Sequence, residues 1–236
     1  MGEPIIDLQD IKKEYKNKKI AINSLTIYPN VIYQIQGDND SGKTLLMDII
    51  AHEKKQDSGT IIFDNKSSKK NEYSRSLTKK NISYLKENNS FWRKKTVLKY
   101  LTNTLKAQKI SSINAYSETM SILEKFDLKK YASVKRNKLS DGTFRKIELL
   151  NILLEKKDII LLDEPFLKID DSFVKKFNYH IKNIIKENKK VIIISSAKSF
   201  AKYRMIKILL RISDGNIVKV EKPGSHYRPA YKKKKI

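Results

Sequence analysis

Residues 37–44 constrain the fold of this chain more than any other part of the sequence. They read Gly-Asp-Asn-Asp-Ser-Gly-Lys-Thr and match the pattern G-x-x-x-x-G-K-[ST]. Residues 31–36 predict a strand before this loop, and residues 42–51 predict a helix after it. The inward-pointing N–H groups of such a loop and the positive end of the helix dipole hold an anion. The pattern therefore predicts a strand–loop–helix unit that binds phosphate, and we call residues 37–44 the phosphate loop.

Individual residues of the phosphate loop have separate expected roles. Lys43 is expected to reach the β- and γ-phosphates of a nucleoside triphosphate, and Thr44 to place its hydroxyl on Mg²⁺. ATP and Mg²⁺ are the expected ligands. The residues expected to line the nucleotide are Gly37, Asp38, Asn39, Asp40, Ser41, Gly42, Lys43, Thr44 and Leu45.

A second motif joins a predicted strand to two acids. Residues 158–162 are apolar after the first, as in the middle of a parallel sheet, and Asp163 and Glu164 follow directly. We expect Asp163 to bind in the Mg²⁺ shell. Glu164 is expected to polarise the attacking water, an effect of roughly 10²–10⁴-fold in rate. A strand ending in two solvated acids is the alternative, and the phosphate loop upstream argues against it.

The order of predicted elements indicates the fold class. Strands alternate with helices, and a mainly helical stretch over residues 95–138 interrupts the alternation. This arrangement is typical of an α/β core with a parallel sheet and helices on both faces. Strands are predicted at residues 5–8, 20–28, 31–36, 60–63, 81–85, 158–162, 191–194, 206–211 and 217–220, and a polar loop at 65–80.

Residues 139–143, Leu-Ser-Asp-Gly-Thr, precede a helix with a basic start near residue 144 and lie between the two motifs. In order and spacing the chain resembles the nucleotide-binding domain of the ABC ATPase family, the ATP-binding subunit of ABC transporters, whose signature is Leu-Ser-Gly-Gly-Gln. The resemblance implies a single domain with a P-loop NTPase core and a mainly parallel sheet (residues 1–87 and 139–220). It also implies an N-terminal antiparallel β subdomain, an inserted α-helical subdomain (88–138) and a basic tail (221–236).

The resemblance also implies roles for residues outside the two motifs. Tyr15 stands where the family places an aromatic ring that stacks on adenine, a contact worth roughly 1–3 kcal/mol. A surface tyrosine among lysines is the alternative. Ser140 and Gly142 match the residues that touch the γ-phosphate of ATP held by the other protomer, and Asp170 matches an aspartate of the dimer interface. Two such domains, identical or different, are therefore expected to close head-to-tail over two ATP molecules.

Two departures from the family pattern concern hydrolysis. The family has a glutamine after the strand at residues 82–85, whereas this chain has Glu87, which could still ligate a metal and joins Lys43 and Glu164 as a catalytic candidate. After the strand at residues 191–194 the family has a histidine that bonds the γ-phosphate. This chain offers Ser196 or Ala197 there.

Two further departures replace glycine by aspartate, at Asp40 in the phosphate loop and at Asp141 in the signature. Each adds an anion beside the triphosphate, where like charges repel, and each could strain a backbone that glycine adopts more readily. The expectation is a site that binds ATP and hydrolyses it slowly.

Composition indicates the surroundings of the chain. Its net charge of +24 fits an acidic partner, although a lysine-rich composition alone also explains it. There is no cysteine, and no apolar run approaches the roughly 20 residues of a membrane span. We therefore expect a cytoplasmic chain, peripheral on the inner face of the cell membrane. Residues 66–109 carry thirteen Lys or Arg against two Glu, which suits contact with anionic lipid.

Three functions remain open. The first is an energy-coupling subunit bound to an integral membrane permease or to a membrane-anchored subunit of a cell-division or lipid-trafficking complex. In that case Phe91, Trp92, Val97 and Tyr100 are candidates for the docking surface, with core packing as the alternative for the first two. The second is a soluble regulator that acts on nucleic acid or the ribosome, and the third is a binding-only partner of a paralogous ATPase. The single domain argues against the second function and Glu164 against the third, so we favour the first.

Overall fold

A computed structural model describes residues 3–16, 18–63, 66–67, 80–87, 95–187, 190–200 and 206–222. The N-terminal part forms a four-stranded antiparallel sheet in the order β2-β1-β4-β5. Its strands are β1 (Ile6–Tyr15), β2 (Lys18–Ile27), β4 (Ser58–Phe63) and β5 (Lys66–Ser67). The predicted antiparallel β subdomain is therefore present.

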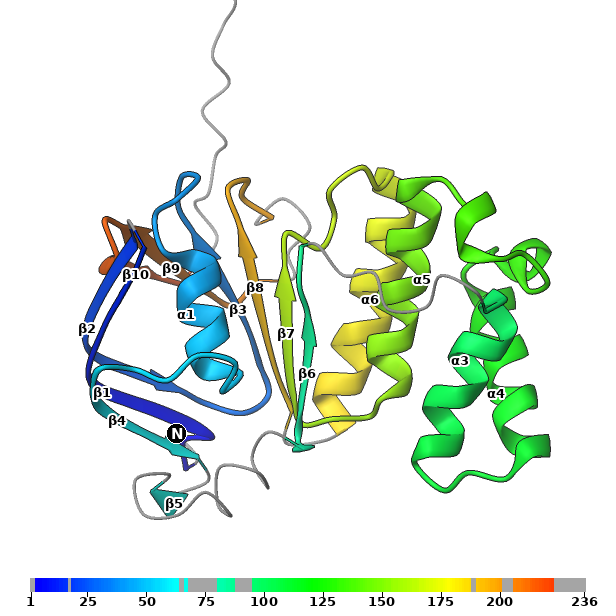
Figure 1. The fold of residues 1–236 in the computed structure, drawn as a ribbon, viewed down its shortest axis with the longest axis horizontal. Coiled ribbons are helices and arrows are strands. Elements are labelled where there is room, and N and C mark those ends of the chain that lie inside the picture. The colour runs from blue at the N-terminus through cyan, green and yellow to red at the C-terminus, as the bar shows by residue number, and fades with distance from the viewer. Residues whose placement is uncertain are drawn as a thin grey trace, which may run out of the picture.

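A second sheet of six strands has the order β10-β9-β3-β8-β7-β6 (Figure 1). All neighbouring pairs are parallel except β9 and β10. Every residue of β7 and β8 is buried, which explains their nearly continuous apolar sequences. The strands are β3 (Val31–Gln36), β6 (Ile82–Leu85), β7 (Ile159–Asp163), β8 (Val191–Ser196), β9 (Ile208–Ser213) and β10 (Asn216–Glu221).

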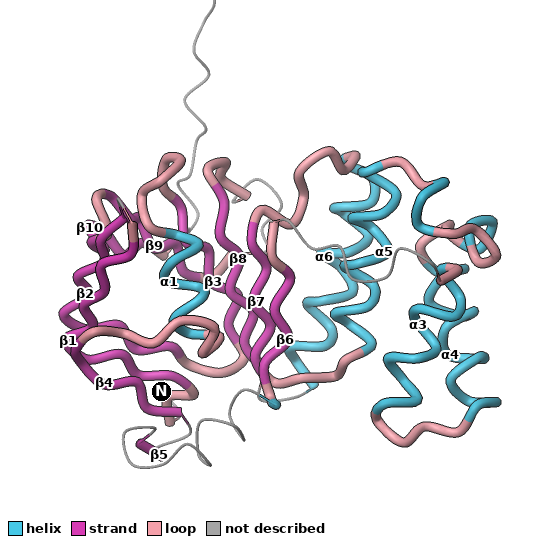
Figure 2. Tube along the Cα trace, viewed as in Figure 1, coloured by secondary structure: helices cyan, strands magenta, loops and turns pink. Residues whose placement is uncertain are grey.

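Helices cover both faces of the six-stranded sheet, as predicted. Helix α1 (Lys43–Ile50) lies between the two sheets, and α5 (Asp141–Leu154) and α6 (Asp171–Glu187) lie on the other face (Figure 1). Beyond them lie α3 (Val97–Ala107) and α4 (Ser112–Lys125), so that the strands gather at one side of the molecule and most helices at the other (Figure 2). Two short 3₁₀ helices follow, Lys129–Tyr131 and Arg136–Lys138.

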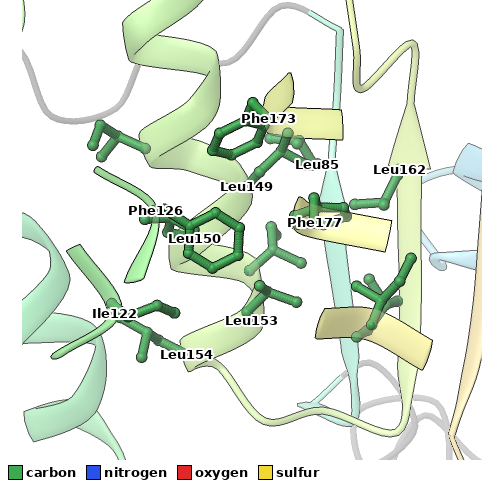
Figure 3. Packing of buried hydrophobic residues seen from close by; sticks show 14 of the residues in the cluster. Leu85, Ile122, Phe126, Leu149, Leu150, Leu153, Leu154, Leu162, Phe173 and Phe177 are labelled. Atoms are coloured by element: carbon green, nitrogen blue, oxygen red, sulfur yellow. The ribbon is translucent and has the colours of Figure 1, made fainter. Parts of the chain in front are cut away.

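One apolar cluster joins the helical insertion to the sheet. Figure 3 shows Phe126 of the α4 region beside Leu150 of α5 and Ile122 beside Leu154, with Phe177 of α6 and Leu162 of β7 further in. A second cluster fills the space between the two sheets around α1. The inserted helices therefore share the core of α5 and α6, and the proposed boundaries at residues 88 and 138 stay predictions.

Two predicted boundaries differ from the structure by three residues or more. Strand β1 extends to Tyr15, whereas the sequence predicted an end at residue 8. The prediction stopped early because Asp10 takes a left-handed φ of 50° and breaks the alternation of buried residues. Leu8 and Ile11, three positions apart, are both fully buried. Helix α5 begins at Asp141 and not near residue 144, because the Ser140 side chain caps it by accepting a hydrogen bond from the N–H of Thr143.

Other sequence-based expectations fall partly outside the described residues. The polar stretch at 65–80 contains the short strand β5, and residues 68–79 are not described. The docking candidates Phe91 and Trp92 and the tail from residue 223 also lie outside the described part. Val97 is fully buried at the start of α3 and belongs to the core. No helix in the described part of the chain is long and apolar enough to cross a membrane.

Candidate nucleotide-binding site

The phosphate loop leaves the carboxyl end of β3 and enters α1. Asp40 and Gly42 take left-handed backbone conformations, with φ of 64° and 100°. A Cβ on Gly37 would lie 2.4 Å from the carbonyl oxygen of Ile212, so only glycine fits there. No side chain caps the N-terminus of α1, which leaves the first N–H groups of the helix for a ligand.

Lys43 is folded back over its own loop. Its side-chain Nζ donates to the carbonyl oxygens of Gly37 and Asp38 at 2.8 and 2.6 Å, and the residue is only 6% exposed. The hydroxyl of Ser41 is also buried and has no hydrogen-bond partner among the described residues. The loop thus gathers one cation, one unpartnered hydroxyl and free helix N–H groups, which fits a phosphate group.

Thr44 and Asp163 meet although 119 positions separate them. The Thr44 hydroxyl donates to one carboxylate oxygen of Asp163 at 2.8 Å, and the hydroxyl of Ser195 on β8 donates to the other. Asp163 is 1% exposed. Oxygen ligands of this kind suit Mg²⁺, which usually takes only one or two from the protein beside phosphates and water. In the described residues no group of three His, Cys, Asp or Glu forms a separate metal site.

Glu164 follows Asp163 in a left-handed conformation, with φ of 42°. Its N–H donates to the carbonyl oxygen of Ser195 at 3.0 Å. Its two carboxylate oxygens accept from the Ser196 hydroxyl at 2.9 Å and from the N–H of Ala197 at 2.8 Å. The residues at the position of the missing histidine therefore hold the candidate base.

Tyr15 lies at the mouth of a cleft of about 480 Å³ beside the phosphate loop. Tyr15 is 42% exposed, and the ammonium of Lys54 lies 4.5 Å from the centroid of its ring. The structure thus brings Tyr15 to the loop, as expected of a stacking ring. This cleft is lined by Tyr15, Lys16, Lys18, Asp40, Thr44, Leu45, Asp48 and Lys54.

A second cleft of about 440 Å³ opens on the other flank of the loop. It reaches from the loop to Ala197 after β8 and to the β9–β10 hairpin. Its lining residues are Gln36, Gly37, Asp38, Asn39, Asp40, Ser41, Ala197, Arg211, Ile212, Ser213, Asp214 and Val218. All nine predicted residues of the loop region therefore border one of the two clefts or, as Gly42 and Lys43 do, lie in the loop between them.

The two aspartates that replace glycine are both paired with cations. Asp40 lies 2.7 Å from the ammonium of Lys18, and Asp141 lies 3.0 Å from that of Lys168. Lys18 holds the pKa of Asp40 below its ordinary value, and Lys168 does the same for the pKa of Asp141. The expected repulsion is thereby offset. Backbone strain is present at Asp40 but was wrongly expected at Asp141, which lies in the first turn of α5.

Ser140 and Gly142 lie at the N-terminus of α5, away from the lining of both clefts. Ser140 caps the helix, and its hydroxyl also donates to the hydroxyl of Thr143 at 3.0 Å. A Cβ on Gly142 would lie 2.6 Å from the carbonyl oxygen of Lys168, so this helix end packs closely on the turn before α6. The two residues are brought to each other but not to the phosphate loop of the same chain.

Asp170 is committed to contacts inside the chain. It caps α6 by accepting from the N–H of Phe173 at 2.9 Å, and it pairs with Lys146 of α5. The hydroxyl of Ser172 donates to it as well. Lys146 is the main cause of a pKa of Asp170 well below its ordinary range. Its predicted interface role stays a prediction.

Glu87 is exposed and lines neither cleft, so the structure does not bring this candidate to the loop. Arg145 of α5, which the sequence motifs did not single out, is close enough for the charge of Glu87 to act on its pKa. Arg145 is 7% exposed and donates to the carbonyl oxygens of Lys86 at 2.7 Å and Asp163 at 2.5 Å. An arginine within a helix of mostly buried residues was the available signal.

These features define a class: a P-loop nucleotide-binding domain whose central sheet carries an inserted helical region. The chain belongs to the ABC transporter family, because the model of that family matches residues 21–167. The resemblance found in the sequence is thereby confirmed, as is the fold class.

Known relatives agree with this family. The zinc import ATP-binding protein ZnuC of Rickettsia bellii is 30% identical over 191 residues, which cover 79% of this chain and 73% of ZnuC. The lipopolysaccharide export system ATP-binding protein LptB of Haemophilus influenzae is 28% identical, over 70% of this chain and 69% of LptB. The ATP-binding protein Uup of Buchnera aphidicola is 29% identical over 74% of this chain, which spans only 29% of Uup.

A solved structure supports the fold. The ATP-binding cassette MJ0796, as a dimer in a post-hydrolysis state bound to ADP and phosphate, superimposes with a TM-score of 0.80. The match covers 93% of this chain and 99% of that one at 19% identity.

Proposed function

We propose that this chain is the ATP-binding and ATP-hydrolysing subunit of a membrane ABC complex. The observation that carries the proposal is the hydrogen bond from Thr44 to Asp163. It joins the phosphate loop to the acidic end of β7 beside Glu164. A chain that only bound phosphate would not need a buried carboxylate and a second acid at this place.

Each group of the site has a task in this proposal. Lys43 exchanges its two carbonyl partners for phosphate oxygens, and Tyr15 stacks on the base. Thr44 and Asp163 would hold Mg²⁺, which neutralises charge on the phosphates when bound. Glu164 orients the attacking water and accepts its proton.

Hydrolysis is proposed to be slow and to need a second ABC ATPase domain. The N-terminus of α5, with Ser140 and Gly142, lines no cleft of its own chain and would face the phosphate loop of a partner domain. Asp170 would lie at that interface. Closure of two domains over ATP is then the step that does work on the membrane subunit.

The membrane association is supported by the relatives and by the surface of α3. ZnuC and LptB are named for an import and an export system, which supports a permease or membrane-anchored subunit as the partner here. Lys99 and Lys106 of α3 are exposed, as are Lys95 and Lys109 just beyond its two ends, while the apolar side of α3 is buried. Such a face suits an anionic lipid surface, at roughly 1 kcal/mol per basic residue. The proposed location is the cytoplasmic side of the membrane.

Phosphate release by the purified chain tests the proposed chemistry. We expect Glu164→Gln to lower the hydrolysis rate at least about 100-fold and to leave the affinity for ATP intact. Equal, measurable rates in the variant and the parent chain would show that Glu164 is not the base, and no phosphate release by the parent chain would show a binding-only protein. Membrane fractionation tests the partner: we expect recovery with membranes after a high-salt wash. Recovery with RNA that salt releases would contradict the proposal.

A further inference from the structure

Two serines at the end of β8 lie beside the two acids at the end of β7. The strands are parallel, and Asp163 is in register with Ser195. The Ser195 hydroxyl donates to Asp163, and the Ser196 hydroxyl donates to Glu164 at 2.9 Å. Each of the two acids therefore accepts a hydrogen bond from a different serine of β8.

The direction of the Ser196 hydrogen bond follows from its second contact. The N–H of Lys198 donates to the Ser196 oxygen at 3.2 Å, so the hydroxyl proton is free for Glu164. Ser196 is 1% exposed, and water cannot readily replace it. The N–H of Ala197 binds the other carboxylate oxygen at 2.8 Å. Both oxygens of Glu164 are thus fixed by neighbouring residues of one turn.

Histidine does not perform this task in the described part of the chain. His52 lies against Phe63, with ring centroids 5.0 Å apart, and His180 lies edge-on to Phe126 at 5.7 Å. Neither borders the clefts beside the phosphate loop.

We propose that Ser196 is the positioning residue of Glu164 and that the site works through this hydroxyl instead of a histidine. Ser196 touches neither nucleotide nor water in this proposal. Its hydroxyl and the adjacent N–H of Ala197 hold the carboxylate in one orientation. The glutamate side chain therefore loses no further conformational entropy when it orients the water at each turnover. The inference rests on the proposed hydrolysis.

Steady-state hydrolysis by Ser196→Ala tests the inference. We expect kcat to fall about 10- to 100-fold, the range for a lost hydrogen bond to a charged group, with KM and the Kd for ATP unchanged. Ser196→Thr keeps the hydroxyl and should restore most of the rate. Ser24→Ala, an exposed serine on β2, serves as the matched control and should leave the rate unchanged. A loss that threonine does not rescue, or one confined to KM, would overturn the proposal.

A double-mutant cycle with Glu164→Gln separates positioning from any independent effect. In that background Ser196→Ala should cost nothing further, because the group it positions is already gone. An equal loss in both backgrounds would refute the positioning role. If Glu164→Gln itself leaves hydrolysis unchanged, the proposed function fails; if it lowers hydrolysis while Ser196→Ala does not, only the positioning role fails.

Discussion

The phosphate loop and the N-terminus of α5 are the two parts of this chain that carry the family's motifs, and they are built differently. Around the loop, groups from distant parts of the sequence converge: Thr44 binds Asp163 of β7, and Lys43 binds carbonyl oxygens of the loop itself. At α5 the side chains are turned to internal contacts, with Ser140 as a cap and Asp141 paired to Lys168. The first region thus gathers groups suited to a ligand, and the second is proposed to act on the nucleotide of a partner domain.

Arg145 connects the two regions. It belongs to α5, yet its guanidinium reaches the carbonyl oxygens of Asp163 and Glu164 at 2.5 and 3.4 Å. Glu148, one turn further along α5, lies 3.3 Å from it inside the core. A movement of α5 against the sheet would therefore act directly on the strand end that carries the two acids.

The largest expected effect comes from breaking this connection. Arg145→Met removes the partner of buried Glu148 and leaves carbonyl oxygens unpaired, so we expect the free energy of unfolding to fall by about 3–5 kcal/mol. Denaturant titration measures it. Lys146→Met, which breaks the half-exposed pair with Asp170, is the control and should cost less than about 1 kcal/mol. Equal losses would mean that the two regions are not joined through Arg145.

Glu148 gives a pH dependence of similar size. Burial raises its pKa from 4.5 to about 7, although Arg145 opposes the shift. Because the folded pKa is raised, this contribution to stability is complete below pH 4.5 and is lost as the pH rises through about 7. The loss is about 3 kcal/mol. Glu148→Gln should remove this slope from unfolding titrations at several pH values, whereas Glu124→Gln, on the exposed side of α4, should keep it. An unchanged slope in Glu148→Gln would show that another group causes it.

Gly142→Ala tests the close packing of the α5 region on the turn before α6. The added Cβ would meet the carbonyl oxygen of Lys168 at 2.6 Å, so we expect a loss of about 1–3 kcal/mol in unfolding free energy. Alanine normally favours a helix over glycine. Thermal stability that rises in this variant would therefore show that the helix end is free of the turn.

The smallest expected effect compares the two aspartates directly. Asp40→Gly should raise the melting temperature by about 2 °C, since glycine adopts the left-handed conformation without strain. Asp141→Gly should lower it by about the same amount, because the first turn of α5 loses an acid at the positive end of its dipole. If calorimetry gave melting-temperature shifts of the same sign for the two variants, the proposed difference in backbone conformation between the two regions would be wrong.

Continuous patterns and short motifs were readable from the sequence, including the meeting of Thr44 and Asp163, and most other side-chain pairings were not. Strand β3, the phosphate loop and the two acids at the end of β7 follow from apolar runs and a short motif. The start of α5 was missed because a capping serine and a glycine look like a break. The contact between Ser196 and Glu164, 32 positions apart, depends on the register of β7 and β8 and on side-chain conformations, which no local pattern encodes.

Equilibrium binding of ATP with Mg²⁺ to the dilute single chain tests the contrast between the two regions most directly. Lys43→Met should weaken binding at least about 100-fold, since the loop loses its cation. Ser140→Arg, which changes the surface of the α5 region, should leave single-chain binding within about 2-fold of the parent, because that region is predicted to act only on a partner's nucleotide. Equal losses in the two variants, or unchanged binding in Lys43→Met, would contradict the account.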